Sequence, residues 1–454
     1  MDALELGGAQ DAAERCELLL ALGEVQLRGG DLPSAQGTFV RAAESARNLG
    51  SADLIARAAL GYGGRFVWTR AGLDLRVVSL LEEALAAMPE TDSPLRARLL
   101  ARLANALRSQ PTRETRVALS AEAVGIARRL ADPATLAYVL DGRWTAAWGP
   151  DNVEERLRLA KELVLLAQQA GDQERLQMAQ LEHLFCLLEL GDIAGADAEL
   201  AVAARLAEEL RQPAQLWLTT AFRAMRALWS GRFEEAEELV EKAFAFGRRA
   251  HSRDAVVTHL MQLFVLRREQ GRVGELEPAL SSSVDEFFDF PLRSLFAALH
   301  SELGQEAEAR ASLDALAVDE FRAVPIDNYW LVSMSLLSEV AAFVGDAQHA
   351  ATLHRLVLPF APYNVLGGPE AWLGSVSRYL GLLATALGRW EAAEYHFEDA
   401  LAMNAEMGAR LWLAHTQHDY GRMLLARDDL ADRERAQEFL DAALGTFREL
   451  GMAT

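Results

Sequence analysis

The feature that most constrains this chain is a spacing pattern that recurs along its 454 residues. A Gly is followed, five positions later, by a small or apolar residue, and the pair returns at intervals of roughly 40 residues, within the 20 to 50 that repeat architectures use. The pattern occurs at Gly30/Ala35, Gly191/Ala196, Gly231/Ala236, Gly271/Leu276, Gly304/Ala309, Gly345/Ala350 and Gly388/Ala393. Such a sustained period is typical of a solenoid, in which stacked units share one continuous core.

Weaker landmarks extend the pattern to the rest of the chain. A second landmark lies about 20 residues after the turn Gly, well inside one repeat period, at Gly50, His251 and Gly408. Further copies fit near Gly72, Pro111 and Gly149, and the last copy has Tyr420-Gly421 and Asp428 with extra residues in its turn. Together these landmarks predict about eleven units in one continuous array over residues 1–454, with a possible soft subdivision near 275–325.

The residue pattern within one unit predicts two helices joined by a tight turn. Apolar residues recur at three- and four-residue spacing on both sides of the turn Gly, which favours amphipathic helices. The Gly can adopt the left-handed conformation that ends the first helix. Small residues such as Ala35 and Ala42 let the second helix approach the first, and Phe39 fills the space between units. Because strand signals are nearly absent, the predicted fold class is all-α.

Composition narrows the function classes. The net charge of -21 repels phosphate backbones, so we expect no direct contact with nucleic acid. No apolar run reaches the roughly 18 residues of a membrane span, and the N-terminus lacks a signal-peptide pattern. The two cysteines, Cys16 and Cys186, show no metal spacing and are expected to be free, buried thiols. These features predict a cytoplasmic protein with no membrane association.

The repeat resembles a known family. Leu22-Gly23, Gly30, Ala35, Phe39 and Ala42 occupy the small-residue positions of the tetratricopeptide repeat, and GRFEEAEELVEKAF (231–244) and GRWEAAEYHFEDAL (388–401) match it well. The resemblance implies a right-handed superhelical solenoid with a long unit of about 40 residues, against the 34 usual in that family. Stretches such as LGSADLIARAALGYGGRF are similar to the C-terminal repeat arm of large, ATP-binding, LuxR-type bacterial regulators of the maltose-activator class.

The chain departs from those regulators in two ways. A P-loop needs a Gly-Lys pair, but the two lysines, Lys161 and Lys242, follow Ala160 and Glu241. No basic helix follows the last repeat, so we expect neither a P-loop ATPase domain nor a helix-turn-helix domain here. The chain is therefore interpreted either as an arm of a longer regulator or as a protein that acts alone.

In this repeat type, the first helix of each unit lines the concave face, which predicts a ligand groove in the last units. The side chains that counting places there are Ser335, Glu339, Arg378, Thr385, His415, His418 and Arg422, with Tyr329, Trp372 and Trp412 one or two turns earlier. Trp372 and Trp412 share a register in consecutive units, so they are expected to flank one groove, unless they only pack between units. Aromatic rings beside Arg and His suit a peptide, a sugar or a small aromatic ligand.

Three motifs allow other chemistry. His415 and His418 lie three apart on one predicted helix, but His396, the nearest third candidate for a metal site, belongs to another helix. Asp428-Asp429-Leu-Ala-Asp432 resembles the magnesium-binding DDxxD motif of class I terpene synthases, yet it falls on an inter-helix turn, where capping is the simpler interpretation. GYGG at 61–64 lacks the preceding strand of a phosphate loop and indicates close helix packing. We expect no metal and no cofactor.

Three functional hypotheses follow. The first is a non-enzymatic arm of a transcriptional regulator that senses a small-molecule inducer or partner by a change in superhelical pitch, since each unit would contact only its neighbours. The second is a stand-alone scaffold that binds a peptide or protein partner. The third is an enzyme that uses a cluster of His415, His418, Asp428 and Asp432. An oligomer is compatible with all three, because a repeat fold alone does not specify chemistry.

Overall fold

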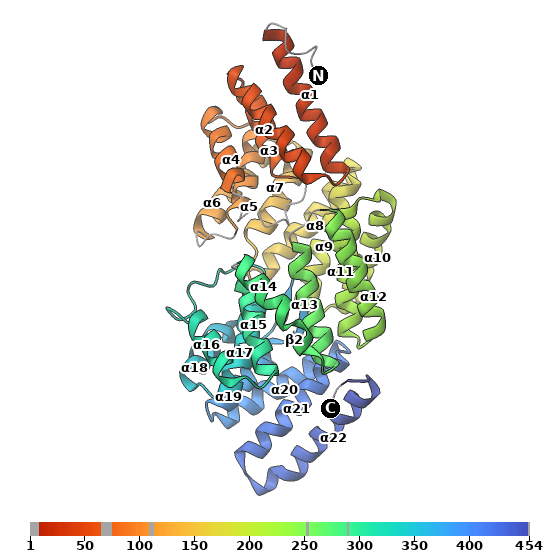
Figure 1. The fold of residues 1–454 in the computed structure, drawn as a ribbon, viewed down its shortest axis with the longest axis vertical. Coiled ribbons are helices and arrows are strands. Elements are labelled where there is room, and N and C mark those ends of the chain that lie inside the picture. The colour runs from red at the N-terminus through yellow and green to blue at the C-terminus, as the bar shows by residue number, and fades with distance from the viewer. Residues whose placement is uncertain (1–8, 65–74, 109–112, 251–253, 288–289, 453–454) are drawn as a thin grey trace.

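The computed structural model describes residues 9–64, 75–108, 113–250, 254–287 and 290–452. The weaker repeat copies near Gly72 and Pro111, and the landmark His251, fall outside these ranges. Within the described ranges the chain forms 22 α-helices, which pair in sequence order into eleven hairpins (Figure 1). The prediction of an all-α array of about eleven units is confirmed.

The first helix of each unit is called the inner helix because it lies on the concave side of the superhelix. The inner helices are α1 (Ala9–Arg28), α3 (Ala52–Tyr62), α5 (Pro94–Ala106), α7 (Pro133–Ala146), α9 (Gln173–Glu189), α11 (Pro213–Trp229), α13 (Asp254–Glu269), α15 (Phe290–Glu302), α17 (Trp330–Val344), α19 (Val376–Ala386) and α21 (Arg410–Arg427). Several begin with Pro, whose fixed φ suits the first helical turn.

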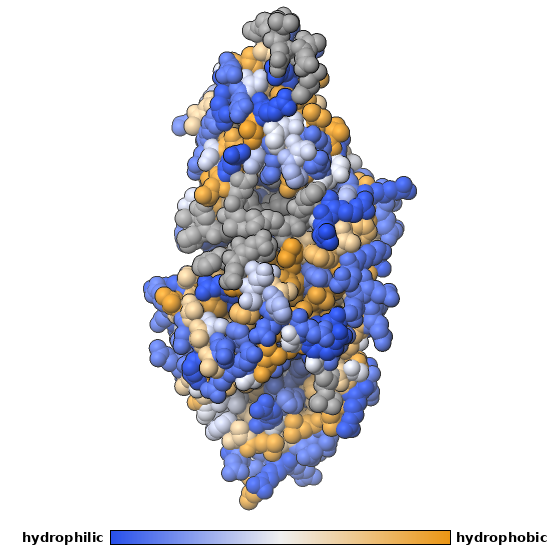
Figure 2. All heavy atoms as spheres, in the orientation of Figure 1, coloured by the Kyte–Doolittle hydropathy of each residue, from blue (hydrophilic) through white to orange (hydrophobic). Residues whose placement is uncertain are grey.

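The second helix of each unit is the outer helix. The outer helices are α2 (Leu32–Asn48), α4 (Leu75–Ala87), α6 (Arg113–Leu130), α8 (Val153–Ala170), α10 (Ile193–Leu210), α12 (Phe233–Arg249), α14 (Glu277–Phe287), α16 (Glu306–Leu316), α18 (Ala347–Val357), α20 (Trp390–Glu406) and α22 (Arg433–Glu449). Three short 3₁₀ segments flank them: η3 (Val273–Leu276), η4 (Leu358–Phe360) and η5 (Leu430–Asp432). Figure 2 shows that the face along α10 and α12 is largely hydrophilic.

The turn glycines behave as the sequence predicted. All seven have positive φ, from 65° at Gly388 to 84° at Gly30. The last unit has Asp428 in the same left-handed region, with φ of 55°, where the other turns have Gly. This conformation is strained for a residue with a Cβ, so Gly is favoured wherever the first helix must end abruptly.

Small residues before the turn make room for the aromatic residue after it. A Cβ placed on Gly23 would lie 2.6 Å from the ring of Phe39, and one placed on Gly381 would lie 2.8 Å from that of Phe397. Both rings are buried. Each Phe ring therefore packs directly against the backbone of a Gly, which confirms that the Phe fills the space beside the inner helix. The same contact, at 2.2 Å from Phe39, explains Gly61 in the GYGG stretch as a packing residue.

Units five apart along the chain also touch each other. A Cβ on Gly30, in the first unit, would lie 3.2 Å from the carbonyl of Arg249 in the sixth. A Cβ on Gly231, in the sixth, would lie 2.7 Å from Leu450 at the end of the eleventh. The premise that each unit contacts only its neighbours is therefore wrong, and contacts between successive superhelical turns oppose the change in pitch that it suggested.

A two-stranded antiparallel hairpin, which the sequence did not predict, lies between the ninth and tenth units. Strand β1 (Asn364–Gly367) pairs with β2 (Ala371–Ser375), with Leu366 opposite Trp372, and every residue of both strands is buried. The hairpin contacts six inner helices: α9, α11, α13, α17, α19 and α21 (Figure 1). Those helices therefore surround it, and the hairpin fills the concave side of the second half of the array.

No helix in the described part of the chain is both long enough and apolar enough to cross a membrane. Cys16 and Cys186 are free and buried, as predicted.

Candidate ligand-binding groove

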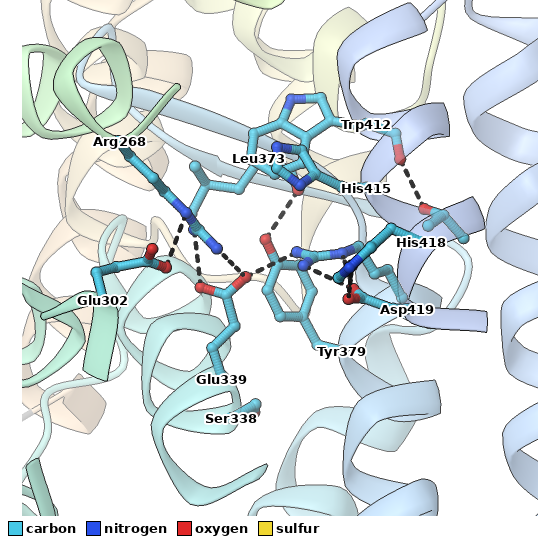
Figure 3. Close-up of polar contacts among 12 residues, drawn as sticks. Arg268, Glu302, Ser338, Glu339, Leu373, Tyr379, Trp412, His415, His418 and Asp419 are labelled. Carbon is cyan, nitrogen blue, oxygen red and sulfur yellow. Dashed lines mark hydrogen bonds and ion pairs between the residues drawn. The ribbon is translucent and has the colours of Figure 1, made fainter. Parts of the chain in front are cut away.

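The side chains predicted to line a groove in the last units form a buried ion-pair network instead. Arg378 of α19 donates to Glu339 of α17 at 2.8 Å and to Asp419 of α21 at 2.7 and 2.8 Å. Arg268 of α13 also binds Glu339, at 3.0 and 3.2 Å, and Glu302 of α15 at 2.9 Å. These side chains come from five inner helices, and Figure 3 shows Arg268, Glu302, Glu339 and Asp419 lying close together. Glu339 and Arg378, both predicted as groove residues, are buried and form an ion pair with each other.

The network keeps its carboxylates charged despite burial. Burial favours the neutral acid at Asp419, but the charge of Arg378 and the hydrogen bond from His418 outweigh it and hold the pKa at about 2. Burial likewise acts to raise the pKa of Glu339, yet Arg268 and Arg378 lower it below its ordinary value. The Arg378 side chain is only 4 % exposed, so its charge is screened little by water.

The two histidines of α21 join the same interior by different contacts. His415 Nε2 lies 3.0 Å from a carboxylate oxygen of Glu269, whose side chain is 2 % exposed. Burial acts to raise the pKa of Glu269, and His415 outweighs that effect and lowers it. His418 Nδ1 lies 3.3 Å from Asp419. The histidines therefore each hold a separate carboxylate rather than sharing a ligand.

The aromatic residues of the predicted groove meet, but in the core. Trp372 was expected on an inner helix and lies on β2, because the inserted hairpin takes the place of that stretch of helix. Its ring stacks on Trp229 of α11, with centroids 4.4 Å apart and an angle of 3°. Trp372 and Trp412 do line one cavity, which holds only about 10 Å³, and both are buried. A cavity of that size accommodates about one water molecule and no ligand.

Tyr329 binds the tip of the hairpin. It is the N-cap residue of α17, and its hydroxyl donates to Glu370 Oε1 at 2.7 Å. Thr258 of α13 donates to the same oxygen at 2.9 Å. Burial raises the pKa of Glu370 to about 7, although both hydrogen bonds oppose the rise. Gln262 of α13 donates to the carbonyl of Pro369 at 2.6 Å, so the inner helices hold the hairpin turn much as a receptor holds a peptide.

Three predicted groove residues lie outside these contacts. Ser335 is fully buried within α17, and its hydroxyl has no hydrogen-bond partner among the described residues. Thr385 donates to the Gly381 carbonyl of its own helix at 2.8 Å. Arg422 is exposed. The structure thus brings together seven of the ten predicted side chains, either in the ion-pair network or around the hairpin, and leaves these three apart.

The proposed catalytic cluster is not assembled. Asp428 is exposed, while Asp432 binds Arg427 at 2.6 and 2.8 Å and Asp429 caps η5. His396 packs edge-on against His354 on another face. The one group of described side chains with metal-ligand spacing is Asp314, Asp346 and His349, far from the DDxxD motif in the chain. The capping interpretation of the DDxxD aspartates is confirmed for Asp429.

Among the described residues, an open groove lies on the inner face of the first half of the array. It encloses about 490 Å³ and is lined by residues of the inner helices α1, α3, α5, α7 and α9. This volume falls within the range of about 300 to 1,000 Å³ typical of ligand sites. The apolar lining residues are Leu20, Leu27, Leu60, Leu95 and Met178. The charged and aromatic ones include Glu24, Arg28, Arg57, Arg98, Tyr138, Asp141, Glu174 and Arg175.

A buried carboxyl pair lies beneath this groove. Burial raises the pKa of Asp141, and burial together with the Asp141 charge raises that of Glu182 well above its ordinary value. Glu182 is fully buried, and neither of its oxygens has a donor among the described groups. Glu182 therefore favours its protonated form, and the pair carries a single negative charge, on Asp141. Arg175 neutralises that charge through a bond of 2.9 Å to Asp141.

The sequence contains a signal for this groove, a set of residues at repeat spacing, which the prediction of a groove in the last units did not use. Arg57, Arg98, Tyr138 and Met178 follow one another at intervals close to the repeat period, so they occupy one register on consecutive inner helices. The same register argument that selected Trp372 and Trp412 applies to them. The register argument holds here because the four residues lie on the described helices α3, α5, α7 and α9, as the repeat spacing requires.

Comparisons with known proteins identify the fold and not a family. No family model and no curated protein match the chain. Among solved structures, it is similar to a Rap protein complexed with Competence and Sporulation Factor, with a TM-score of 0.53, 14% identity, and coverage of 88% of this chain and 99% of that one. Two further structures have lower TM-scores. Naa15/Naa10 bound to HypK-THB has a TM-score of 0.26 and 13% identity, with coverage of 95% of this chain and 89% of that one. A circular tandem repeat protein has a TM-score of 0.15 and 15% identity, with coverage of 97% of this chain and 91% of that one. The Rap likeness places the chain among helical tandem-repeat solenoids of tetratricopeptide type.

Proposed function

We propose that this protein is a non-enzymatic helical-repeat scaffold that binds an extended peptide or protein segment in the groove of its first five units. One observation carries the proposal. The inner face is open there over about 490 Å³, whereas the chain's own hairpin fills the equivalent space in the second half. The hairpin also supports the view that inner helices of this array can hold a segment of chain, since Gln262 and Tyr329 bind its turn.

The lining of the groove suits a peptide. Its lining combines aliphatic side chains from α1, α3 and α5 with charged side chains from all five inner helices. A row of pockets that accept alternate side chains, with polar groups for orientation, is how helical and extended segments are recognised. The Rap protein of similar fold was solved in complex with Competence and Sporulation Factor, which supports the choice of a bound factor over a substrate.

The resemblance to regulator arms adds a finer proposal. If the arm belongs to a LuxR-type regulator, occupation of the groove by an inducer or partner is relayed to transcription. Contacts between units five apart couple the groove to the second half of the array, because Gly30 in the first unit lies against Arg249 in the sixth. When a ligand binds and shifts the first units, this contact therefore moves the second half of the array as a rigid body, without a change in superhelical pitch.

Selection from a library tests the proposal. The purified full-length chain is used to select displayed random dodecapeptides, and a recovered peptide is labelled and titrated by fluorescence anisotropy. Leu27→Arg places a charged side chain on the wall of the groove and is expected to weaken binding at least tenfold. Leu425→Arg is the matched control, because Leu425 is half exposed on α21, away from the groove. Circular dichroism verifies that both variants keep their helices.

Two results would contradict the proposal. One is the recovery of no peptide that binds the purified chain in solution. The other is equal affinity of the wild-type and Leu27→Arg proteins for every recovered peptide, which would place binding outside the groove.

A further inference from the structure

Four arginines line the groove, Arg28, Arg57, Arg98 and Arg175, and they differ in their pairing with carboxylates. Arg57 forms a bidentate ion pair with Glu17, at 2.5 and 2.7 Å. Arg175 binds Asp141 at 2.9 Å and lies 3.6 Å from Asp172. These guanidinium groups are therefore already paired with carboxylates of the chain itself.

Arg98, between them on α5, has no such partner. Its guanidinium makes no ion pair with any carboxylate of the described residues, and its one hydrogen bond is a long contact of 3.4 Å from Nη2 to Thr135 Oγ1. Its Nε–H is buried and has no acceptor there. Asp132, nearby, directs its two oxygens to the backbone amides of Ala134 and Thr135 at the start of α7. The charge of Arg98 helps to lower the pKa of Asp132, but no carboxylate of the described residues lies within ion-pair distance of its guanidinium. A half-buried guanidinium without a directly contacting anion is costly, so the site favours a ligand that supplies one.

The position of Arg98 is held by an aromatic ring. Tyr138 of α7 lies between two guanidinium groups, with Arg98 Cζ 5.6 Å and Arg175 Cζ 5.3 Å from the ring centroid. Cation–π attraction orients both groups against the ring, and Asp141 holds Arg175 in place from the other side. The free donors of Arg98 are thus oriented before a ligand arrives, in the planar fork that matches a carboxylate.

We propose that Arg98 binds a carboxylate of the peptide that occupies the groove. The inference rests on the proposed function and specifies the chemistry of its ligand. The carboxylate belongs either to an Asp or Glu side chain or to the C-terminus of the peptide, and the residues beside it are aliphatic, because Leu60 and Leu95 line the adjacent wall. The chain as a whole carries a net charge of -21, so an acidic ligand is attracted by this local cation and by nothing more general.

The test uses one peptide recovered by the selection described above, in three synthetic forms. The first is the original peptide, the second has its acidic side chains replaced by the corresponding amides, and the third has a C-terminal carboxamide. Each form is titrated against wild-type, Arg98→Gln, Arg98→Lys and Arg232→Gln proteins. Arg232 is a suitable control because its half-exposed side chain lies in an i,i+3 ion pair with Glu235, on another turn.

One form of amide substitution is expected to weaken binding to the wild-type protein at least tenfold, and which form does so identifies the source of the carboxylate. Arg98→Gln should weaken binding of the original peptide by the same factor. The Arg98→Gln and wild-type proteins should bind that amide form with equal affinity. Arg98→Lys should fall between the two, and Arg232→Gln should match wild type. If all three peptide forms bind the wild-type protein equally, the Arg98 assignment is overturned while the peptide-binding scaffold stands. If no peptide is recovered, the proposed function itself fails.

Discussion

Replacement of Glu370 by Gln tests whether the hairpin tip carries a buried acid that titrates near neutral pH. Glu370 is 2 % exposed and accepts hydrogen bonds from Tyr329 and Thr258 on Oε1, while Oε2 is buried without a donor. The negative charge of Asp254 on α13 raises its pKa further. Gln keeps the shape and both hydrogen bonds to the oxygen, and it removes the ionisation.

The direction and size of the effect follow from linkage. The pKa of Glu370 rises from 4.5 to about 7 on folding, so between these values the folded state holds a proton that the unfolded state has lost. The wild-type protein therefore loses stability as pH rises from about 4.5 to 7, and the loss is complete above 7. A shift of this size corresponds to about 3 kcal/mol. The Glu370→Gln variant should show none of this decline.

Hydrogen exchange of residues 364–375 measures the effect locally. Opening free energies of wild type and Glu370→Gln are compared at pH 5, 6, 7 and 8, so that titration of all other groups cancels in the difference. The difference should be small at pH 5 and grow to about 3 kcal/mol in favour of the variant at pH 8. Glu406→Gln, at an exposed position of α20, should show no such trend. A difference that stays constant from pH 5 to 8 would refute the reasoning.

Further predictions concern the ion-pair network and the turns. Arg378→Gln leaves buried Asp419 without its arginine and Glu339 with only Arg268, and it should lower the free energy of unfolding by about 3 to 5 kcal/mol, measured in urea with circular dichroism. Arg410→Gln, which removes the exposed pair with Glu449, should cost less than about 1 kcal/mol, and equal losses in the two variants would contradict the network. Gly388→Ala should destabilise by about 1 kcal/mol, since φ there is 65°. Asp428→Gly, at φ 55°, should stabilise by a similar amount, and a lower melting temperature would contradict it.

The local structure of the repeats was predictable from sequence because it depends on neighbours along the chain. The turn glycines have the left-handed conformation that was expected, and Gly23 makes room for Phe39 as the spacing required. Each of these features is decided by sterics within one hairpin. The number of units followed directly, since every hairpin repeats the same local rules.

The candidate site was predicted only in part. Register selected Glu339, Arg378 and His418, which lie on α17, α19 and α21 and contact one another or Asp419. It could not show that these charges would neutralise one another, because their partners Arg268 and Asp419 come from other units. Register also failed at Trp372, since a strand had been read as a helix.

Tertiary structure alone decided which half of the array is open. Small rotations between neighbouring units accumulate until units five apart meet, and that sum depends on the packing of every interface rather than on any one repeat. The same coiling brings six inner helices, from α9 of the fifth unit onward, around the hairpin, and the open groove lies among the inner helices α1 to α9. The sequence thus determined the unit and its copies, and three-dimensional packing determined where the inner face closes on the chain itself and where it stays open around Arg98.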